Sequence, residues 1–329
     1  MMNTIFLLAI IAGIGFWWMY QFKKRNDLYK NIPGPRGFPI LGNSIQLKST
    51  AKLLNILLYY SKQCGGIVKF QVGPIRRFIV VSDYKLLEFI LSSTKLVNKS
   101  ADYKFFHPWL GTGLLTSDGP KWKKHRRILT PGFHFLILGQ FIEVFERCGN
   151  KLVEKLEKEV SKDSVNIYPF ITLCALDIIC ESIMGTNIDA QNDENSVYVR
   201  SVKDMCRIVI QRTVSPLQMF DLLFPFTKNY YTQRKALSIL HTHTNNVITR
   251  RRQEMENTKR EEVSKQKNRL TENKKVFLDL LLQSTVDGRK LSQQEIREEV
   301  DTFMFEGHDT IGSAVSFSLF CLANYPDVQ

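Results

Sequence analysis

The sequence predicts a mainly α-helical protein with a small β element near the start of its globular part. Residues 66–82 alternate apolar and polar side chains around Gly73 and Pro74, which is typical of a β-hairpin. A capping box from Ser292 to Glu295 opens a helix that no proline interrupts before Pro326, a run of about 30 residues or roughly 45 Å. Between these features, apolar residues recur with helical spacing over 142–160, 171–184, 197–214, 230–262 and 276–284.

Composition and length exclude several classes of protein. The chain has 329 residues, of which 44% are hydrophobic and 23% charged, so it is neither a disordered tail nor a small disulfide scaffold. Its length allows about two domains or one large helical domain. The six cysteines are scattered without a C-x-x-C pair, which predicts reduced thiols in a cytosol-like compartment and no zinc or iron–sulfur site.

The N-terminal segment has the pattern of a membrane anchor. Residues 4–22 carry no charge and would span roughly 28 Å as a helix, close to the thickness of a bilayer core. Aromatic residues end the run and Lys23, Lys24 and Arg25 follow it, which places that end in the cytosol. A cleaved signal peptide is the alternative, but the basic start and the small-residue cleavage site are missing. We therefore predict an anchor over 1–22 and a basic, proline-rich hinge over 23–39.

The formal net charge of +13 is spread along the chain instead of forming one patch. Nucleic-acid binding is therefore unsupported, and an anionic membrane surface or an acidic protein partner explains the excess more simply.

The glycines at 111 and 113 suggest a dinucleotide turn, but a third glycine and a surrounding strand–helix unit are missing. Neither a phosphate loop nor a G-x-S-x-G elbow is present, so a nicotinamide dehydrogenase, an ATPase and a serine hydrolase are disfavoured.

Trp122 and Arg126 are a candidate ligand-binding pair. They lie four residues apart after Pro120, so an indole N–H and a guanidinium share one face of a short helix. Two such donors suit a carboxylate ligand. Judged by spacing alone, a solvated basic helix face is the favoured alternative.

The long helix contains a second candidate site. Glu306, His308, Asp309 and Thr310 place polar groups in an apolar helix, beside Gly307. Each buried polar group costs about 1–3 kcal/mol without a partner, which indicates a functional break. The Thr310 hydroxyl can bond the Glu306 carbonyl, bend the helix and open a groove for a small ligand, with Asp309 as a proton shuttle. A kinked core helix whose polar groups reach the surface is an equal alternative.

Together these segments resemble a membrane-bound cytochrome P450, most closely family four, the fatty-acid ω-hydroxylase group. The resemblance implies that residues 40–329 form the N-terminal part of that fold, an incomplete catalytic domain ending after the oxygen-binding helix. It also implies that Trp122 and Arg126 bind a haem propionate, with the role of the adjacent His125 left open. By the same resemblance Gly307, Asp309 and Thr310 form the oxygen-activating turn, with Asp309 and Thr310 catalytic, and Glu306 can esterify a haem methyl group.

The resemblance further implies haem (iron-protoporphyrin) as cofactor, NADPH-cytochrome P450 reductase as electron donor, and insertion of one oxygen atom from O₂ into a lipophilic substrate such as a fatty acid. Membrane lipid is an expected partner, nucleic acid is not, and the expected location is the endoplasmic reticulum membrane (microsomes) with the catalytic domain cytosolic. Segments 100–116 and 197–226, rich in apolar residues, are the predicted substrate path.

Two departures from the family pattern matter. Ile311 stands where the family often has a second hydroxyl residue, which would thin the water network. The E-x-x-R helix and the F-x-x-G-x-x-x-C-x-G loop are absent from the chain, so no metal ligand is assigned. Because a thiolate promotes O–O cleavage, the chain alone is expected to be inactive. An incomplete sequence of an active enzyme is favoured over a natural truncation, a membrane-anchored binding protein without chemistry.

Overall fold

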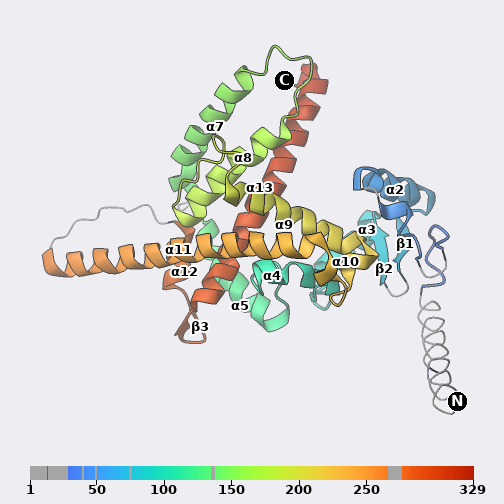
Figure 1. Ribbon diagram of the computed structural model, residues 1–329, viewed down its shortest axis with the longest axis horizontal. Coiled ribbons are helices and arrows are strands. Elements are labelled where there is room, and N and C mark those ends of the chain that lie inside the picture. The colour runs from blue at the N-terminus through green and yellow to red at the C-terminus, as the bar shows by residue number, and fades with distance from the viewer. Residues whose placement is uncertain are drawn as a thin grey trace. The chain divides into compact units, whose positions relative to one another are not determined.

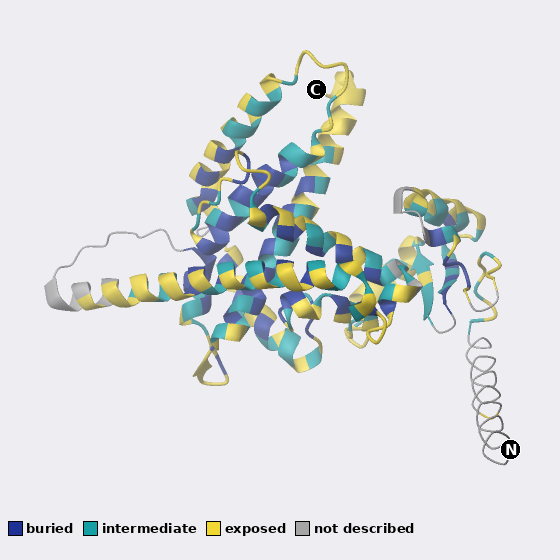
Figure 2. Ribbon diagram, in the orientation of Figure 1, coloured by how far each residue is buried: buried dark blue, intermediate teal, exposed yellow. Residues whose placement is uncertain are grey.

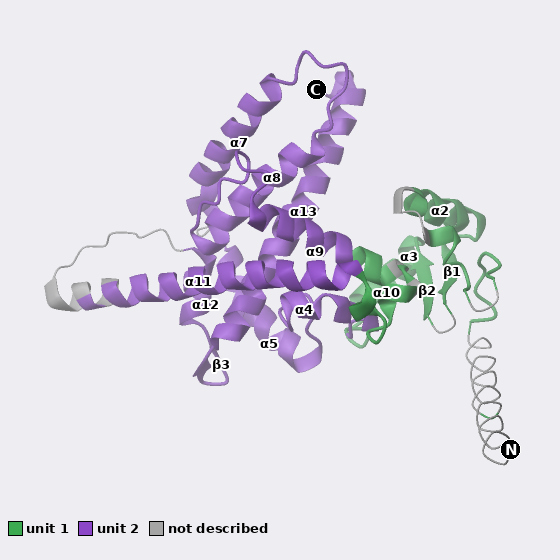
Figure 3. Cartoon of the chain, viewed as in Figure 1, with its two compact units in different colours: residues 1–97, 210–227 green, residues 98–209, 228–329 purple. Residues whose placement is uncertain are grey.

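The structure is a computed structural model that describes residue 13 and residues 29–38, 41–48, 50–73, 76–134, 138–265 and 276–329. The chain divides into two compact units, coloured separately in Figure 3: Met1–Val97 with Ile210–Thr227, and Asn98–Val209 with Lys228–Gln329. The predicted anchor over 1–22 lies outside the described residues, apart from residue 13. Among the helices that are described, none combines the length and apolarity needed to cross a membrane.

Unit 1 contains the predicted β-hairpin. Strands β1 (Ile67–Val72) and β2 (Arg76–Val81) pair antiparallel, with Phe70 opposite Phe78. Every second residue of β1 is buried, as the alternating sequence predicts. The rest of unit 1 comprises η1 (Gln46–Lys48), α2 (Thr50–Gln63), α3 (Tyr84–Ser92), α10 (Pro216–Met219) and η6 (Phe224–Phe226).

The described residues of unit 2 form helices and one short hairpin, joined by turns and loops (Figure 1). Its longest helices are α11 (Lys228–Lys265) and α13 (Gln293–Asn324), and α9 (Val197–Val214) starts in this unit. The shorter elements are η2 (Ala101–Phe105), α4 (His107–Leu110), α5 (Gly119–Leu129), η3 (Thr130–Phe133), η4 (Gly139–Phe141), α7 (Ile142–Glu157), α8 (Tyr168–Ile179), the π-helical turn η5 (Cys180–Met184), α12 (Phe277–Gln283), β3 (Thr285–Val286), β4 (Arg289–Lys290) and η7 (Pro326–Val328).

The core of unit 2 is built around α8 and the first half of α13. Both segments are largely buried in Figure 2, whereas the last turns of α13 are exposed. Glycines let the two helices approach closely: a Cβ at Gly307 would lie 2.5 Å from Cδ1 of Ile179, and one at Gly312 would lie 2.8 Å from the Thr172 hydroxyl. These glycines therefore have a packing role of their own.

Two expectations about local structure need correction. The predicted break in the long helix is wrong, because α13 continues through Gly307 without interruption, although the Thr310 hydroxyl does donate to the Glu306 carbonyl as expected. The hairpin of β3 and β4 was not predicted, because strands of two residues are too short to show periodicity. Asp287 and Gly288, both with positive φ, form its turn, and that Asp-Gly pair was the available signal.

Candidate functional site

A pocket of about 680 Å³ lies against the middle of α13. Its volume falls in the range of roughly 300–1,000 Å³ that is typical of small-molecule sites. On α13 the lining residues repeat every three or four positions, so they share one face of the helix: Phe303, Glu306, Gly307, Thr310, Ile311 and Val315. Helices α7 and α8 contribute an apolar wall of Phe145, Leu152, Ile171, Cys174, Ala175, Ile178 and Ile179.

Aromatic rings form the end of the pocket near α12 and η3. Phe277 and Phe303 meet edge to face with centroids 4.7 Å apart, and Phe133 lies 5.9 Å from Phe277 and 5.5 Å from Phe303. Such contacts stabilise by about 0.5–1.5 kcal/mol beyond burial. They hold flat apolar surfaces against the polar turn of α13. No sequence motif marked these phenylalanines, although the spacing of Phe303 from Thr310 places both on one helix face.

Glu306 is the one carboxylate among the described residues that line this pocket. Burial raises the pKa of the Glu306 carboxyl above its usual range, and the positive charges of Lys99 and Arg126 offset part of that rise. Arg126 is exposed, and its guanidinium makes no hydrogen bond or ion pair within the described part of the chain. The positive charge of Arg126 therefore acts on the Glu306 carboxyl, while the N–H groups of the Arg126 guanidinium stay available to a ligand.

Of the predicted site residues, Glu306, Gly307 and Thr310 meet in the pocket, whereas Asp309 points elsewhere. Its Oδ1 accepts a hydrogen bond of 2.9 Å from the hydroxyl of Tyr168, the first residue of α8. Burial and this bond to Asp309 raise the pKa of Tyr168. No sequence signal linked these residues, which are 141 positions apart.

His308 completes the polar turn without entering the pocket. Its ring is buried, and Nδ1 lies 2.8 Å from the carbonyl oxygen of Met304. Burial lowers the pKa of His308, which favours the neutral ring. The histidine is therefore a satisfied core residue.

Helix α5 begins as predicted, with Asp118 before its first turn and Pro120 inside it. Trp122 is half-buried and packs against the main core cluster, whereas Arg126 lies at the exposed edge. Neither lines the pocket directly. Lys123, Arg126 and Arg127 are exposed whereas His125 is buried, so the helix has a solvated basic side and a core-facing side, and both interpretations of the Trp122 and Arg126 pair stay predictions.

Consecutive carboxylates of α13 hold α5 and the loop before it. Glu299 Oε1 lies 2.6 Å from His125 Nδ1, and Glu299 Oε2 accepts the backbone N–H of Leu114 over 3.1 Å. Glu298 accepts from the Thr112 hydroxyl over 3.2 Å. A Cβ at Gly113 would lie 2.6 Å from the Glu298 carbonyl oxygen, so the glycine permits the loop to lie on α13. This is the structural role of the glycines that suggested a dinucleotide turn.

The residues described around this pocket fit one side of a haem group. The exposed guanidinium of Arg126 and the half-buried indole of Trp122 would suit a haem propionate, and the apolar pocket with its hydroxyl-bearing turn would suit a large apolar ring. All six cysteines are free thiols, and Cys174 is the one that lines the pocket. Burial, with the neighbouring Cys148 and Asp177, raises the pKa of Cys174 to about 12, so it is a neutral thiol rather than a thiolate.

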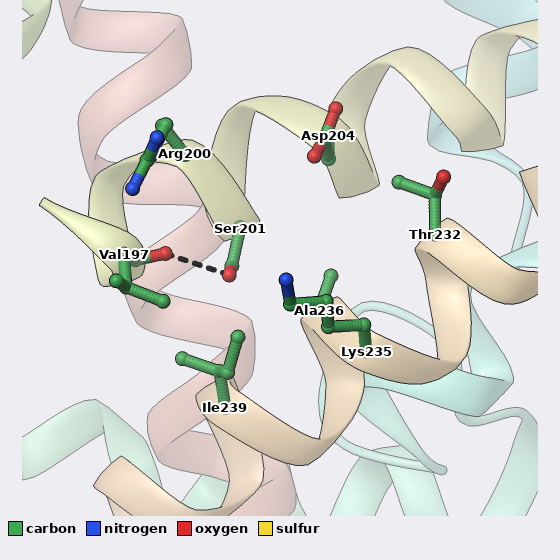
Figure 4. A pocket seen from close by; sticks show the side chains of 8 residues that line it. All are labelled: Val197, Arg200, Ser201, Asp204, Thr232, Lys235, Ala236 and Ile239. Atoms are coloured by element: carbon green, nitrogen blue, oxygen red, sulfur yellow. Dashed lines mark hydrogen bonds between the residues drawn. The ribbon is translucent and has the colours of Figure 1, made fainter. Parts of the chain in front are cut away.

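A second, smaller pocket of about 230 Å³ lies between α9 and α11, with side chains of the two helices facing it (Figure 4). None of the predicted catalytic or cofactor-binding residues lines this groove, whereas four residues of the predicted substrate path do: Val197, Arg200, Ser201 and Asp204. The predicted substrate path is absent from the lining of the larger pocket: Phe106 and Trp109 instead pack against Phe305, at 5.6 and 5.1 Å between ring centroids. That path remains a prediction.

The site is thus a mostly apolar pocket beside the polar turn of a long helix, in a mainly helical protein, and its volume suits a small molecule. The family model of cytochrome P450 matches residues 32–329, and the chain belongs to the cytochrome P450 family.

Three relatives with family-four names confirm the more specific resemblance. Cytochrome P450 4V2 of Mus musculus is 42% identical, over 94% of this chain and 60% of the relative. The Homo sapiens protein of the same name is 42% identical over 89% and 57%, and cytochrome P450 4d2 of Drosophila melanogaster is 39% identical over 99% and 66%. The chain thus spans 57–66% of the length of these relatives.

Proposed function

We propose that this chain provides the propionate-binding helix and the oxygen-side helix of a haem-dependent monooxygenase that hydroxylates lipophilic substrates, such as fatty acids or related lipids. The pocket beside α13 carries the proposal, because it joins Glu306, Gly307 and Thr310 to an almost entirely apolar lining. An apolar pocket with few polar groups binds and orients a lipid-like molecule and excludes water. Family membership supports haem as the bound group.

Haem, when bound, supplies the iron at which O₂ is activated. The guanidinium of Arg126 and the indole N–H of Trp122 would hold a propionate, as a fixed charge and a neutral donor. The Thr310 hydroxyl, which donates to the Glu306 carbonyl, can turn to hold a water molecule in the pocket. Asp309, which lies outside the pocket lining, can exchange protons with solvent and pass them toward Thr310 through water.

The iron thiolate is proposed to come from outside residues 1–329, because no cysteine of the chain has the expected sequence context and the pocket cysteine is a neutral thiol. Electrons are proposed to arrive from NADPH-cytochrome P450 reductase, and the net charge of +13 favours an acidic partner or an anionic membrane. The uncharged run over 4–22 supports an N-terminal anchor in the endoplasmic reticulum membrane.

Glu306 is further proposed to form a partial ester with a haem methyl group during turnover. The Glu306 carboxylate would be the group that attaches to the haem, and bound haem with O₂ would supply the two-electron oxidation that such an ester requires. Haem that acidified organic solvent extracts completely after turnover would contradict the ester, and Glu306→Ala should make all haem extractable.

The test of the proposed function is the spectrum of the reduced protein under carbon monoxide, expressed with any coding sequence that follows Gln329. A strongly red-shifted Soret band is expected for thiolate-bound haem. The competing function is a membrane-anchored binding protein without chemistry, which the neutral thiol of Cys174 in a mostly apolar pocket favours. Lipid binding without that band would support this alternative and reject the monooxygenase.

A further inference from the structure

The contact between His125 and Glu299 is the most deeply buried of the contacts between a basic and an acidic side chain in the described part of the chain. The side chains are 5% and 1% exposed, and 2.6 Å separate Nδ1 of the histidine from the carboxylate oxygen. A buried carboxylate is very costly unless its oxygens have partners. Both oxygens of Glu299 have one, because the second accepts the N–H of Leu114. The carboxylate therefore fixes α5 and the loop before it to α13 at one point.

Because His125 is part of α5, its contact with Glu299 bears on the directions in which the other side chains of α5 point. Successive residues of an α-helix are about 100° apart around its axis, so Trp122 and Arg126 lie about 40° from each other, and His125 lies on the neighbouring face. With His125 held inward against α13, Arg126 is left at the exposed edge. The positive charge of Arg126 still acts on Glu306 in the pocket. A rotation of α5 would move the indole and the guanidinium together.

We propose that His125 and Glu299 form a positioning pair, which fixes the rotation of α5 so that Trp122 and Arg126 present their donors to one haem propionate. This rests on the proposed function, since it assigns a role toward the same bound group. The pair contributes no atom to the ligand and acts through Arg126. Family resemblance left the role of His125 open, and the contact with Glu299 assigns it.

A nearby contact provides a matched control. Lys121, also on α5, donates to the Thr112 hydroxyl and lies 3.5 Å from Glu298 Oε2. It therefore connects α5 to the loop before it and to α13, as His125 and Glu299 do. Its side chain is 37% exposed, and exposed ion pairs contribute little to stability. Lys121→Met should therefore leave haem affinity unchanged.

The experiment measures the transfer of haem from the protein, expressed with any coding sequence that follows Gln329, to a haem-free globin. His125→Phe should speed haem loss about tenfold, the order of effect seen when a residue that orients a ligand-binding group is removed. His125→Asn, whose amide can donate from nearly the same place as Nδ1, should recover most of that loss. If His125→Phe does not fold, His125→Gln, which donates from one bond further out, replaces it in each comparison.

A double-mutant cycle with Arg126→Gln separates positioning from general stability. Positioning predicts that His125→Phe has almost no further effect on haem loss once Arg126 is replaced. Effects that multiply independently would overturn the proposal, as would an equal effect of Lys121→Met. If the unaltered protein holds no thiolate-bound haem at all, the proposed function is rejected instead. The positioning role is then rejected with it, because there is no bound haem to position.

Discussion

Tyr168 donates a hydrogen bond to Asp309 over 2.9 Å, which joins the first residue of α8 to the polar turn of α13. The bond holds the carboxylate of Asp309 outside the pocket, next to Glu306, Gly307 and Thr310 in the sequence but apart from them in space. A residue proposed to relay protons is therefore already engaged by a partner. Delivery of a proton from Asp309 toward Thr310 requires this contact to exchange with water.

Tyr168→Phe should lower the free energy of unfolding by about 1 kcal/mol, the usual net value of one hydrogen bond, because the side chain of Tyr168 is partly exposed. Asp309→Asn keeps an acceptor and should cost less. Urea unfolding of the single and double variants provides the measurement. In an Asp309→Ala background, Tyr168→Phe should have no further effect, and fully additive losses would show that the bond does not contribute.

Gly307→Ala should destabilise the protein by about 1–3 kcal/mol, because the added Cβ would lie 2.5 Å from Cδ1 and 2.6 Å from Cγ1 of Ile179. That cost outweighs the gain in helix propensity of about 1 kcal/mol. Adding Ile179→Ala removes both obstructing atoms, so the double variant should be more stable than the sum of the single effects.

The control for that variant is Gly149→Ala on α7, where a Cβ would meet nothing within 4 Å. It should raise the free energy of unfolding by up to about 1 kcal/mol. Equal destabilisation by both alanines would indicate that contact with Ile179 is not the cause. Thermal unfolding followed by far-ultraviolet circular dichroism measures both.

Asp301 predicts a pH dependence of stability. Burial raises the pKa of this carboxyl to about 7, against an ordinary value of 3.8. Thr244 donates to Oδ1 over 2.7 Å, whereas Oδ2 has no hydrogen-bond partner among the described residues. A raised pKa favours the folded protein when the group is protonated. This contribution is therefore fully present below about pH 4 and is lost as pH rises to about 7, a change of about 4 kcal/mol at most.

Asp301→Asn should flatten that part of the stability profile, measured by urea unfolding between pH 4 and 8. Thr244→Val removes the hydrogen bond that lowers the pKa of Asp301, so it should move the loss of stability to higher pH. A profile that Asp301→Asn leaves unchanged would assign the dependence to another group.

The cysteines should differ sharply in reactivity. Cys321 is exposed, whereas burial raises the pKa of Cys174 and of Cys206 to about 12. Because the thiolate is the reactive form, iodoacetamide at pH 8 should modify Cys321 first and leave Cys174 intact until the protein unfolds. Mass spectrometry of digested samples resolves the order. Rapid modification of Cys174 in the folded protein would mean that it has thiolate character and is open to solvent.

Much of the local structure followed from sequence pattern. Alternation over 66–82 gave β1 and β2, and the capping box at Ser292 gave the start of α13 with its predicted bonds to Glu295. Helical spacing placed α9 at its observed bounds and identified Glu306, Gly307 and Thr310 as neighbours on one helix. These features depend on residues a few positions apart, whose spacing the sequence states directly.

The family resemblance added roles for Trp122 and Arg126 that spacing alone disfavoured; the chain's membership of the cytochrome P450 family is shown, and those two roles stay predictions. The sequence could not show that His125 meets Glu299, because 174 positions separate them. It also gave the wrong expectation of a broken helix at Gly307, where close packing of Ile179 explains the glycine.

By itself, then, the sequence determined the helical class, the hairpin, the long helix, the polar turn and the family to which these motifs belong. Only the tertiary structure decided which polar groups are partnered and which face the pocket: Asp309 bonds Tyr168, Glu299 bonds His125, and Arg126 is left unpaired within the described residues. The physical reason is that helix periodicity sets the face on which a side chain lies. The partner of that face depends on how distant segments pack.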